Sequence, residues 1–163
     1  MPLRNLRNIT SWERVSKIIK ETKDTEVLHH IISGIVGSVA CAEFFQVVEE
    51  IDSLPPIPDI LAAEGSLLLS LLPNKVSAMY GLAYSVSSYC NNLNDYRNAI
   101  RVFNTLVSID DGKPRYEIQA LAMEILLFKV HSLKDANLIL KLTRSPEYTL
   151  YRKQVKSVLS PSL

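Results

Sequence analysis

Apolar and polar residues along this chain recur mainly with the period of an α-helix. The first clear pattern places Trp12, Val15 and Ile18 on one face, and Thr10 with Glu13 three residues later forms a capping box in front of it. We therefore expect the first helix to begin near Thr10. Because strand-like alternation is scarce, the pattern predicts an all-α fold, an irregular bundle of about seven to nine helices.

Turn residues separate the later helical patterns. A short second helix is expected over residues 26–33, where the glycines Gly34 and Gly37 break it, and a third over residues 38–50. Residues 59–63 indicate a single turn, and residues 65–74 are apolar without a clear period. The remaining helices are expected over residues 77–91, 96–107 and 116–131, over a short stretch that ends at residue 142, and from residue 146 to residue 159.

One of these segments is apolar on more than half of its circumference. It covers residues 116–131 and includes Leu121, Ile125 and Leu126. A helix that is apolar around most of its surface lies inside a protein. We therefore predict that this helix is central to the bundle.

Prolines divide the chain into three parts. Pro55, Pro56 and Pro58 follow Leu54, and each proline fixes its own backbone angle and disfavours helix at the residue before it. The predicted parts are N-terminal helices over residues 1–54, a proline-rich connector over residues 55–75 and a C-terminal helical part over residues 76–163. A single domain overall is the alternative, since 163 residues can bury about 68–70% of the unfolded surface in one core.

Charge is balanced overall but uneven along the chain. The formal net charge is +1, and it combines +4 over residues 1–23, −8 over residues 24–128 and +5 over residues 129–163. Basic ends and an acidic centre can neutralise one another in the fold, or a basic end can meet an acidic partner. The near-neutral total and the lack of a helix-turn-helix signature make a nucleic-acid partner the weaker expectation.

The cellular compartment that we expect follows from the cysteines and from the lack of long apolar runs. Cys41 and Cys90 each lie among apolar helical residues, where a free thiol behaves as a small hydrophobic group. No signal peptide is supported at the start, and the apolar run from Leu67 to Leu72 is far shorter than the ~20 residues of a membrane helix. We expect a cytoplasmic protein without membrane contact.

Residues with catalytic or metal-binding chemistry are scattered. His29 and His30 are adjacent, so on a helix they point about 100° apart and cannot chelate one ion together. His131 stands alone, and no serine or cysteine has a nucleophile motif around it. The sequence predicts no metal site and no catalytic residue.

Four segments share a further pattern in a fixed order. They read ITSWERVS over residues 9–16, IISGIVGSVACAEFF over residues 31–45, LPPIPDILA over residues 54–62 and SAMYGLAY over residues 77–84. In this order they resemble the region C-terminal to the ATPase core in MoxR-type AAA+ ATPases, over roughly residues 7–130. The family's ATP-driven rings remodel protein assemblies or insert cofactors. The resemblance implies a helical lid and tail that docks on an ATPase core as a regulatory or assembly subunit, or a remnant that kept the fold and lost the motor.

The chain lacks the motor of that family. No glycine begins a Gly-x-x-x-x-Gly-Lys-(Ser/Thr) loop, and no strand ending in Asp-Glu is present to hold magnesium. We therefore do not expect this chain to hydrolyse ATP by itself, and ATP would be a cofactor only in combination with an ATPase core. Thr10 stands where the family has its sensor-2 arginine, so Arg7 and Arg14 are the remaining candidates for a nucleotide contact.

Partner binding is the function that these features favour. Leu3, Leu6 and Ile9 are spaced by three ahead of Trp12, and we predict that these four residues form the face that meets a partner. That partner is an AAA+ core or another protein subunit. The alternative is a free-standing helical adaptor that binds protein through a groove between helices, without any ATPase partner.

Overall fold

Ten helices and no strand make up residues 3–108 and 115–159, the part of the chain that the computed structural model describes. The predicted all-α fold is confirmed. The number of helices exceeds the predicted seven to nine because two short helices form where the sequence indicated one turn and an apolar stretch. They are α4 (Ile57–Ala62) and α5 (Gly65–Leu71).

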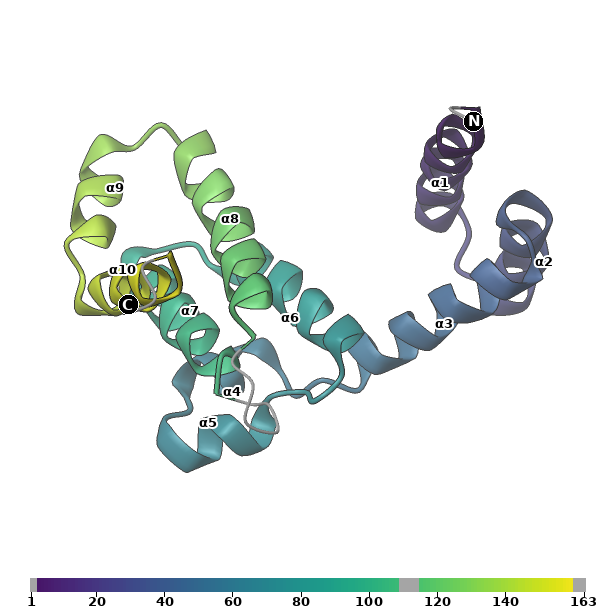
Figure 1. The fold of residues 1–163 in the computed structure, drawn as a ribbon. Helices are drawn as coiled ribbons and strands as arrows, with labels where there is room; N and C mark the ends of the chain where they lie inside the picture. Colours follow the sequence, from purple (N-terminus) through teal and green to yellow (C-terminus); the bar gives the residue numbers. More distant parts are fainter. Residues whose placement is uncertain (1–2, 109–114, 160–163) are drawn as a thin grey trace. The chain divides into compact units, whose positions relative to one another are not determined.

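The other helices follow in chain order (Figure 1). They are α1 (Leu3–Glu21), α2 (Thr25–Val36), α3 (Ser38–Asp52), α6 (Val76–Tyr89), α7 (Leu93–Leu106), α8 (Tyr116–Ser132), α9 (Ala136–Thr143) and α10 (Pro146–Leu159). They divide into two compact units, unit 1 over residues 1–49 and unit 2 over residues 50–163. Each unit has its own hydrophobic cluster and is described by itself.

Unit 1 contains α1, α2 and most of α3. The fully buried apolar residues among those of unit 1 that are described are few, namely Val15, Ile32 and Cys41, and partly buried side chains such as Phe44 pack around them. Asp24 begins α2 by accepting hydrogen bonds from two backbone N–H groups of the first turn, at 3.0 and 3.1 Å. The start of α2 is therefore well capped, although the hydrophobic core of unit 1 is small.

Two predicted helix boundaries in unit 1 are wrong. The first helix begins at Leu3 rather than near Thr10, because a capping box favours a start without preventing helix in front of it. The second helix continues through Gly34, which costs only about 1 kcal/mol in a helix interior. It ends at Gly37, whose φ of 95° lies in the region that favours glycine.

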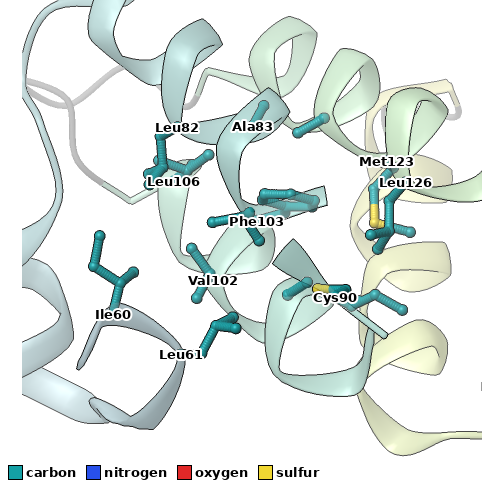
Figure 2. Packing of buried hydrophobic residues seen from close by; sticks show 14 of the residues in the cluster. Ile60, Leu61, Leu82, Ala83, Cys90, Val102, Phe103, Leu106, Met123 and Leu126 are labelled. Atoms are coloured by element: carbon teal, nitrogen blue, oxygen red, sulfur yellow. The ribbon is translucent and has the colours of Figure 1, made fainter. Parts of the chain in front are cut away.

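Unit 2 is built around α7 rather than around α8. Helix α7 packs against α4, α6, α8, α9 and α10, and Phe103 lies in the middle of the buried cluster shown in Figure 2. Helix α8 is buried on one side, but its Phe128 is 78% exposed. Apolar coverage of the 116–131 segment therefore overstated its burial, because some of these side chains face solvent.

The residues predicted as a connector contribute to the core of unit 2. Ile60 and Leu61 of α4 and Leu68 of α5 are each at most 3% exposed. Pro58 occupies the first turn of α4, where its missing N–H would have no helical partner in any case. The prolines thus set the start of α4, and the helix then packs onto α7 and α6.

A close contact joins the last turn of α3 to α6 within unit 2. Glu50 accepts a hydrogen bond from Lys75 Nζ at 2.7 Å and another from Ser77 Oγ. One residue later, Ile51 lies so near Gly81 that a Cβ on this glycine would come within 2.3 Å of its Cγ1. A side chain at position 81 would therefore force Ile51 to move, so glycine is favoured at this position.

We predict that two phenylalanine substitutions will have opposite outcomes. Phe103→Ala should destabilise the chain by about 3–5 kcal/mol, because it opens a cavity in a fully buried site. Phe128→Ala should change the free energy of unfolding by less than about 0.5 kcal/mol, since this ring is mostly exposed. Urea unfolding followed by circular dichroism measures both. Similar losses of unfolding free energy in the two variants would contradict the central position of α7.

A second prediction concerns Gly81. In the natural background, Gly81→Ala should destabilise by roughly 1 kcal/mol, because overpacking against Ile51 outweighs the better helix propensity of alanine. In an Ile51→Ala background the same change should stabilise by up to about 1 kcal/mol. Urea unfolding of the four proteins of this double-mutant cycle gives the coupling. An equal effect of Gly81→Ala in both backgrounds would show that the contact is unimportant.

Candidate functional site

Unit 1 carries an apolar stripe along α1. Ile9 is 61% exposed, Trp12 is 37% exposed and Ile19 is 38% exposed. Their spacing of three and seven residues places them on one side of the helix. We call these three residues the α1 stripe.

The Trp12 ring is partly packed within unit 1 and partly exposed to solvent. Its ring packs on Phe44 of α3 with a centroid distance of 5.6 Å and an angle of 44° between the planes. The side chain therefore anchors α1 to α3 without being enclosed. An aromatic ring that is positioned on one side and accessible on the other is typical of a protein-binding surface.

Further apolar side chains of unit 1 are exposed on α2 and α3. Val27 and Ile31 lie one turn apart on α2, at 44% and 38% exposure, and Val39 of α3 is 72% exposed. Close by in the sequence, His29 stacks on Phe45 with a centroid distance of 5.2 Å. Among its described residues, unit 1 thus exposes more large apolar side chains than it fully buries.

The predicted site residues all lie on α1, but only some can be placed in full. Leu3, Leu6 and Arg7 are helical, and their side chains lie outside the part of the structure that is described. Arg14 is exposed. Ile9 and Trp12 belong to the α1 stripe, so the structure brings two of the four predicted partner-binding residues together.

Metal-binding and nucleophilic chemistry finds no support among the described residues. No group of three or more His, Cys, Asp or Glu side chains in these ranges could hold a metal ion. Cys41 is buried and donates from Sγ to the carbonyl of His29 at 3.4 Å. Burial, with a smaller effect of Asp95, raises the pKa of Cys90 to about 12, so this thiol stays protonated and unreactive at neutral pH.

Unit 2 contains a hollow of about 350 Å³ between α5, α7 and α10, and most of its lining surface is apolar. Leu69 and Leu150 supply apolar walls, and Asn104, Gln154 and Arg101 supply polar ones. Its two charged lining residues are both paired. Arg101 donates to Glu64 at 2.5 Å, and Glu147 accepts from Arg97 at 2.9 and 3.0 Å. The lining is therefore close to electrically neutral.

A chain of amide side chains lies at this hollow. Gln119 of α8 is 1% exposed, and its Nε2 donates to Asn104 Oδ1 at 3.0 Å and to Gln154 Oε1 at 2.6 Å. Asn104 in turn donates to the carbonyl of Glu147 at 2.9 Å. These bonds join three helices. Sequence reasoning missed this network because each partner is at least 15 residues from the next.

Two basic side chains act as remote helix caps. Arg101 donates to the carbonyls of Leu61 and Ala63, at 2.7 and 3.1 Å, at the end of α4. Lys129 Nζ lies 2.7–2.9 Å from three carbonyl oxygens at the end of α6, including that of Cys90. Cations suit these positions because the last carbonyls of a helix have no partner and carry partial negative charge. Both residues are structural.

Comparison of the chain with protein-family models, with curated proteins and with solved structures found no match. Among the described residues, no helix has the length and apolar character needed to cross a membrane. The chemistry of the site therefore rests on the described geometry.

Acid should weaken unit 2 through Glu147. Its ion pair with Arg97 lowers the pKa of the Glu147 carboxyl below the ordinary 4.5. A lowered folded-state pKa stabilises the fold above pH 4.5, and this contribution is lost as pH falls through the folded pKa. We therefore expect the stability difference between the natural chain and Glu147→Gln to shrink below pH 4.5. Urea unfolding at several pH values measures it, and a difference that is constant down to pH 3 would contradict the prediction.

Proposed function

We propose that this chain is a non-catalytic helical lid and tail that docks on the core of a MoxR-type AAA+ ATPase, as a regulatory or docking part of a remodelling machine. The α1 stripe is the observation that carries the proposal. The sequence resemblance supplies the class of partner. In this proposal the chain contributes binding surface, and the partner contributes the nucleotide chemistry.

The size of unit 1 supports a docking role. A segment of about 50 residues buries too small a fraction of its surface to be stable by much, and unit 1 has three fully buried apolar residues. Covering the α1 stripe would remove further apolar surface from water, at about 25 cal/mol per Å². Docking would therefore complete a core that unit 1 leaves small.

The position of the stripe fits the resemblance. Trp12 and Ile9 fall within the ITSWERVS segment, which in the family belongs to the lid close to the nucleotide. Arg14 is on the same helix, is exposed, and is the described residue that could approach a nucleotide held by the partner. The nucleotide contact would then form only in the complex.

We expect a purified MoxR-type AAA+ core without its own lid to bind this chain, and Ile9→Asp with Ile19→Asp to weaken binding at least about 30-fold, as loss of a hot spot does. The matched control is Phe128→Asp in unit 2, which replaces an exposed apolar residue outside the α1 stripe. Calorimetry gives the affinities. Circular dichroism must show unchanged helicity in all variants.

Other outcomes separate the alternatives. Equal binding by both variants would move the docking surface away from α1. If the core does not bind and the α1 stripe is needed to bind a different purified protein, the chain is a free-standing adaptor. Micromolar binding of Mg-ATP to this chain alone would contradict the non-catalytic role, since the proposal assigns nucleotide binding to the partner.

A further inference from the structure

Helices α6 and α8 of unit 2 pack side by side and share an outer surface (Figure 1). Both also pack on α7, so the sides that they turn away from α7 lie next to each other. The two helices run in the same direction. Arg115, the N-cap of α8, donates to the carbonyl of Asn74 at 3.3 Å, and Lys129 binds three carbonyls at the end of α6. A residue of α8 therefore lies level with a residue 39–42 positions earlier in the chain.

This outer surface carries exposed aromatic rings. Val76, Tyr80 and Tyr84 of α6 are spaced by four residues, which places them on one side of the helix. Tyr84 is 59% exposed, and Phe128 of α8 is more exposed still, at 78%. Aromatic side chains are enriched in the surfaces through which proteins bind one another. The rings therefore mark this side of unit 2 as a candidate interface.

Two carboxylates lie on the same side of α8 as Phe128. Glu117 and Glu124 are two helical turns apart, and Phe128 follows one turn later. Both carboxylates are exposed, and the ion pairs found among the described residues use other acidic side chains. Glu124 is level with Tyr84, and Glu117 is level with Val76. We call the following residues the α6–α8 face: Val76, Tyr80, Tyr84, Glu117, Glu124 and Phe128.

The charge and the rings of the α6–α8 face restrict what can cover it. A nucleic acid or an anionic lipid would be repelled by the two carboxylates. An entirely apolar partner would remove these carboxylates from water without giving them a hydrogen-bond donor. Arginine suits both parts of the face, because its guanidinium stacks on an aromatic ring and donates two parallel hydrogen bonds to a carboxylate. Seven residues of helix span about 10 Å, so two arginines two turns apart on a partner helix match Glu117 and Glu124.

We propose that the α6–α8 face binds an arginine-bearing helix of a partner protein, with arginines seven residues apart that pair with Glu117 and Glu124. Tyr84, level with Glu124, stacks on one guanidinium, and Val76 and Tyr80 contact the apolar side of the partner helix. The face lies wholly in unit 2. Its occupancy therefore does not depend on the docking of α1.

The test uses two synthetic alanine-rich peptides of about 15 residues, long enough to form a helix. One carries two arginines seven residues apart, and the other carries lysines at the same positions. Two-dimensional NMR of the ¹⁵N-labelled full chain at low salt follows binding. The arginine peptide should shift backbone signals of α6 and α8 saturably, with a Kd on the order of 1 mM or below. The lysine peptide should bind about fivefold more weakly, because an ammonium group cannot form the paired hydrogen bonds and stacks less well on rings.

Paired variants of the chain locate the binding. Glu117→Gln with Glu124→Gln removes both charges at nearly constant side-chain size, and it should weaken binding of the arginine peptide at least about tenfold. The matched control is Glu21→Gln with Glu43→Gln, which makes the same change in net charge at two exposed carboxylates of unit 1 and should leave binding unchanged. Tyr84→Ala should weaken binding about fivefold through the lost stacking. Circular dichroism must show unchanged helicity in all variants.

Three results with the peptides would overturn the proposal. They are the absence of saturable shifts on α6 and α8 up to about 10 mM peptide, roughly ten times the expected Kd, equal weakening by the two glutamate pairs, and equal binding of the arginine and lysine peptides. The second would reduce the binding to an attraction by net charge, and the third would show that the rings take no part.

A second copy of the chain is the other candidate for covering this face. Sedimentation of the chain alone would then show a dimer, and Glu117→Gln with Glu124→Gln would dissociate it. That result would assign the α6–α8 face to self-association and would also overturn the proposal. A monomer at every concentration, together with saturable binding of the arginine peptide, supports an arginine-bearing partner helix.

Discussion

The arrangement of unit 2 depends on the hydrogen bonds and ion pairs that the polar side chains of α7 make with the helices around it. Most polar groups on a helix in this position need a partner, because an unpartnered buried group costs about 1–3 kcal/mol. Arg101 binds the end of α4, Arg97 binds the start of α10, and Asn104 binds both α10 and α8. The polar residues of α7 therefore fix which helix lies on which side.

The helices themselves could be predicted where local signals agree. A helix is expected over residues 96–107, and the side chain of Asn92 just before it accepts from Asp95 N at 3.0 Å as the cap of α7. The helix expected from residue 146 is α10, and Ser145 Oγ accepts from Tyr148 N at 3.2 Å at its start. Such caps involve residues three apart, so their energetics are visible in the sequence. The helices without such signals depend on burial. Helices α4 and α5 are short and have weak helix signals in the sequence, and the burial of Ile60 and Leu68 stabilises them.

The candidate sites divide along the same line. Two of the three residues of the α1 stripe, Ile9 and Trp12, were included in the predicted face, because helical spacing is a local property of the sequence. The hollow in unit 2 could not, since its walls come from residues as far apart as Gly65 and Gln154. Arg101 shows the difficulty best. In the sequence it is one more surface charge on an amphipathic helix, and its role depends on carbonyl groups 38 and 40 residues away.

The two units differ in how completely each buries its apolar residues, and this difference bears on function. Unit 2 encloses Tyr96, Phe103 and more than a dozen other apolar side chains in one cluster, a core of the size expected for an ordinary domain. Unit 1 encloses three and leaves the α1 stripe in water. A partner that covers the stripe would therefore stabilise unit 1 far more than unit 2. Because binding energy spent on ordering a weakly stable segment is subtracted from affinity, such a partner must supply a large apolar surface, which a small ligand cannot offer.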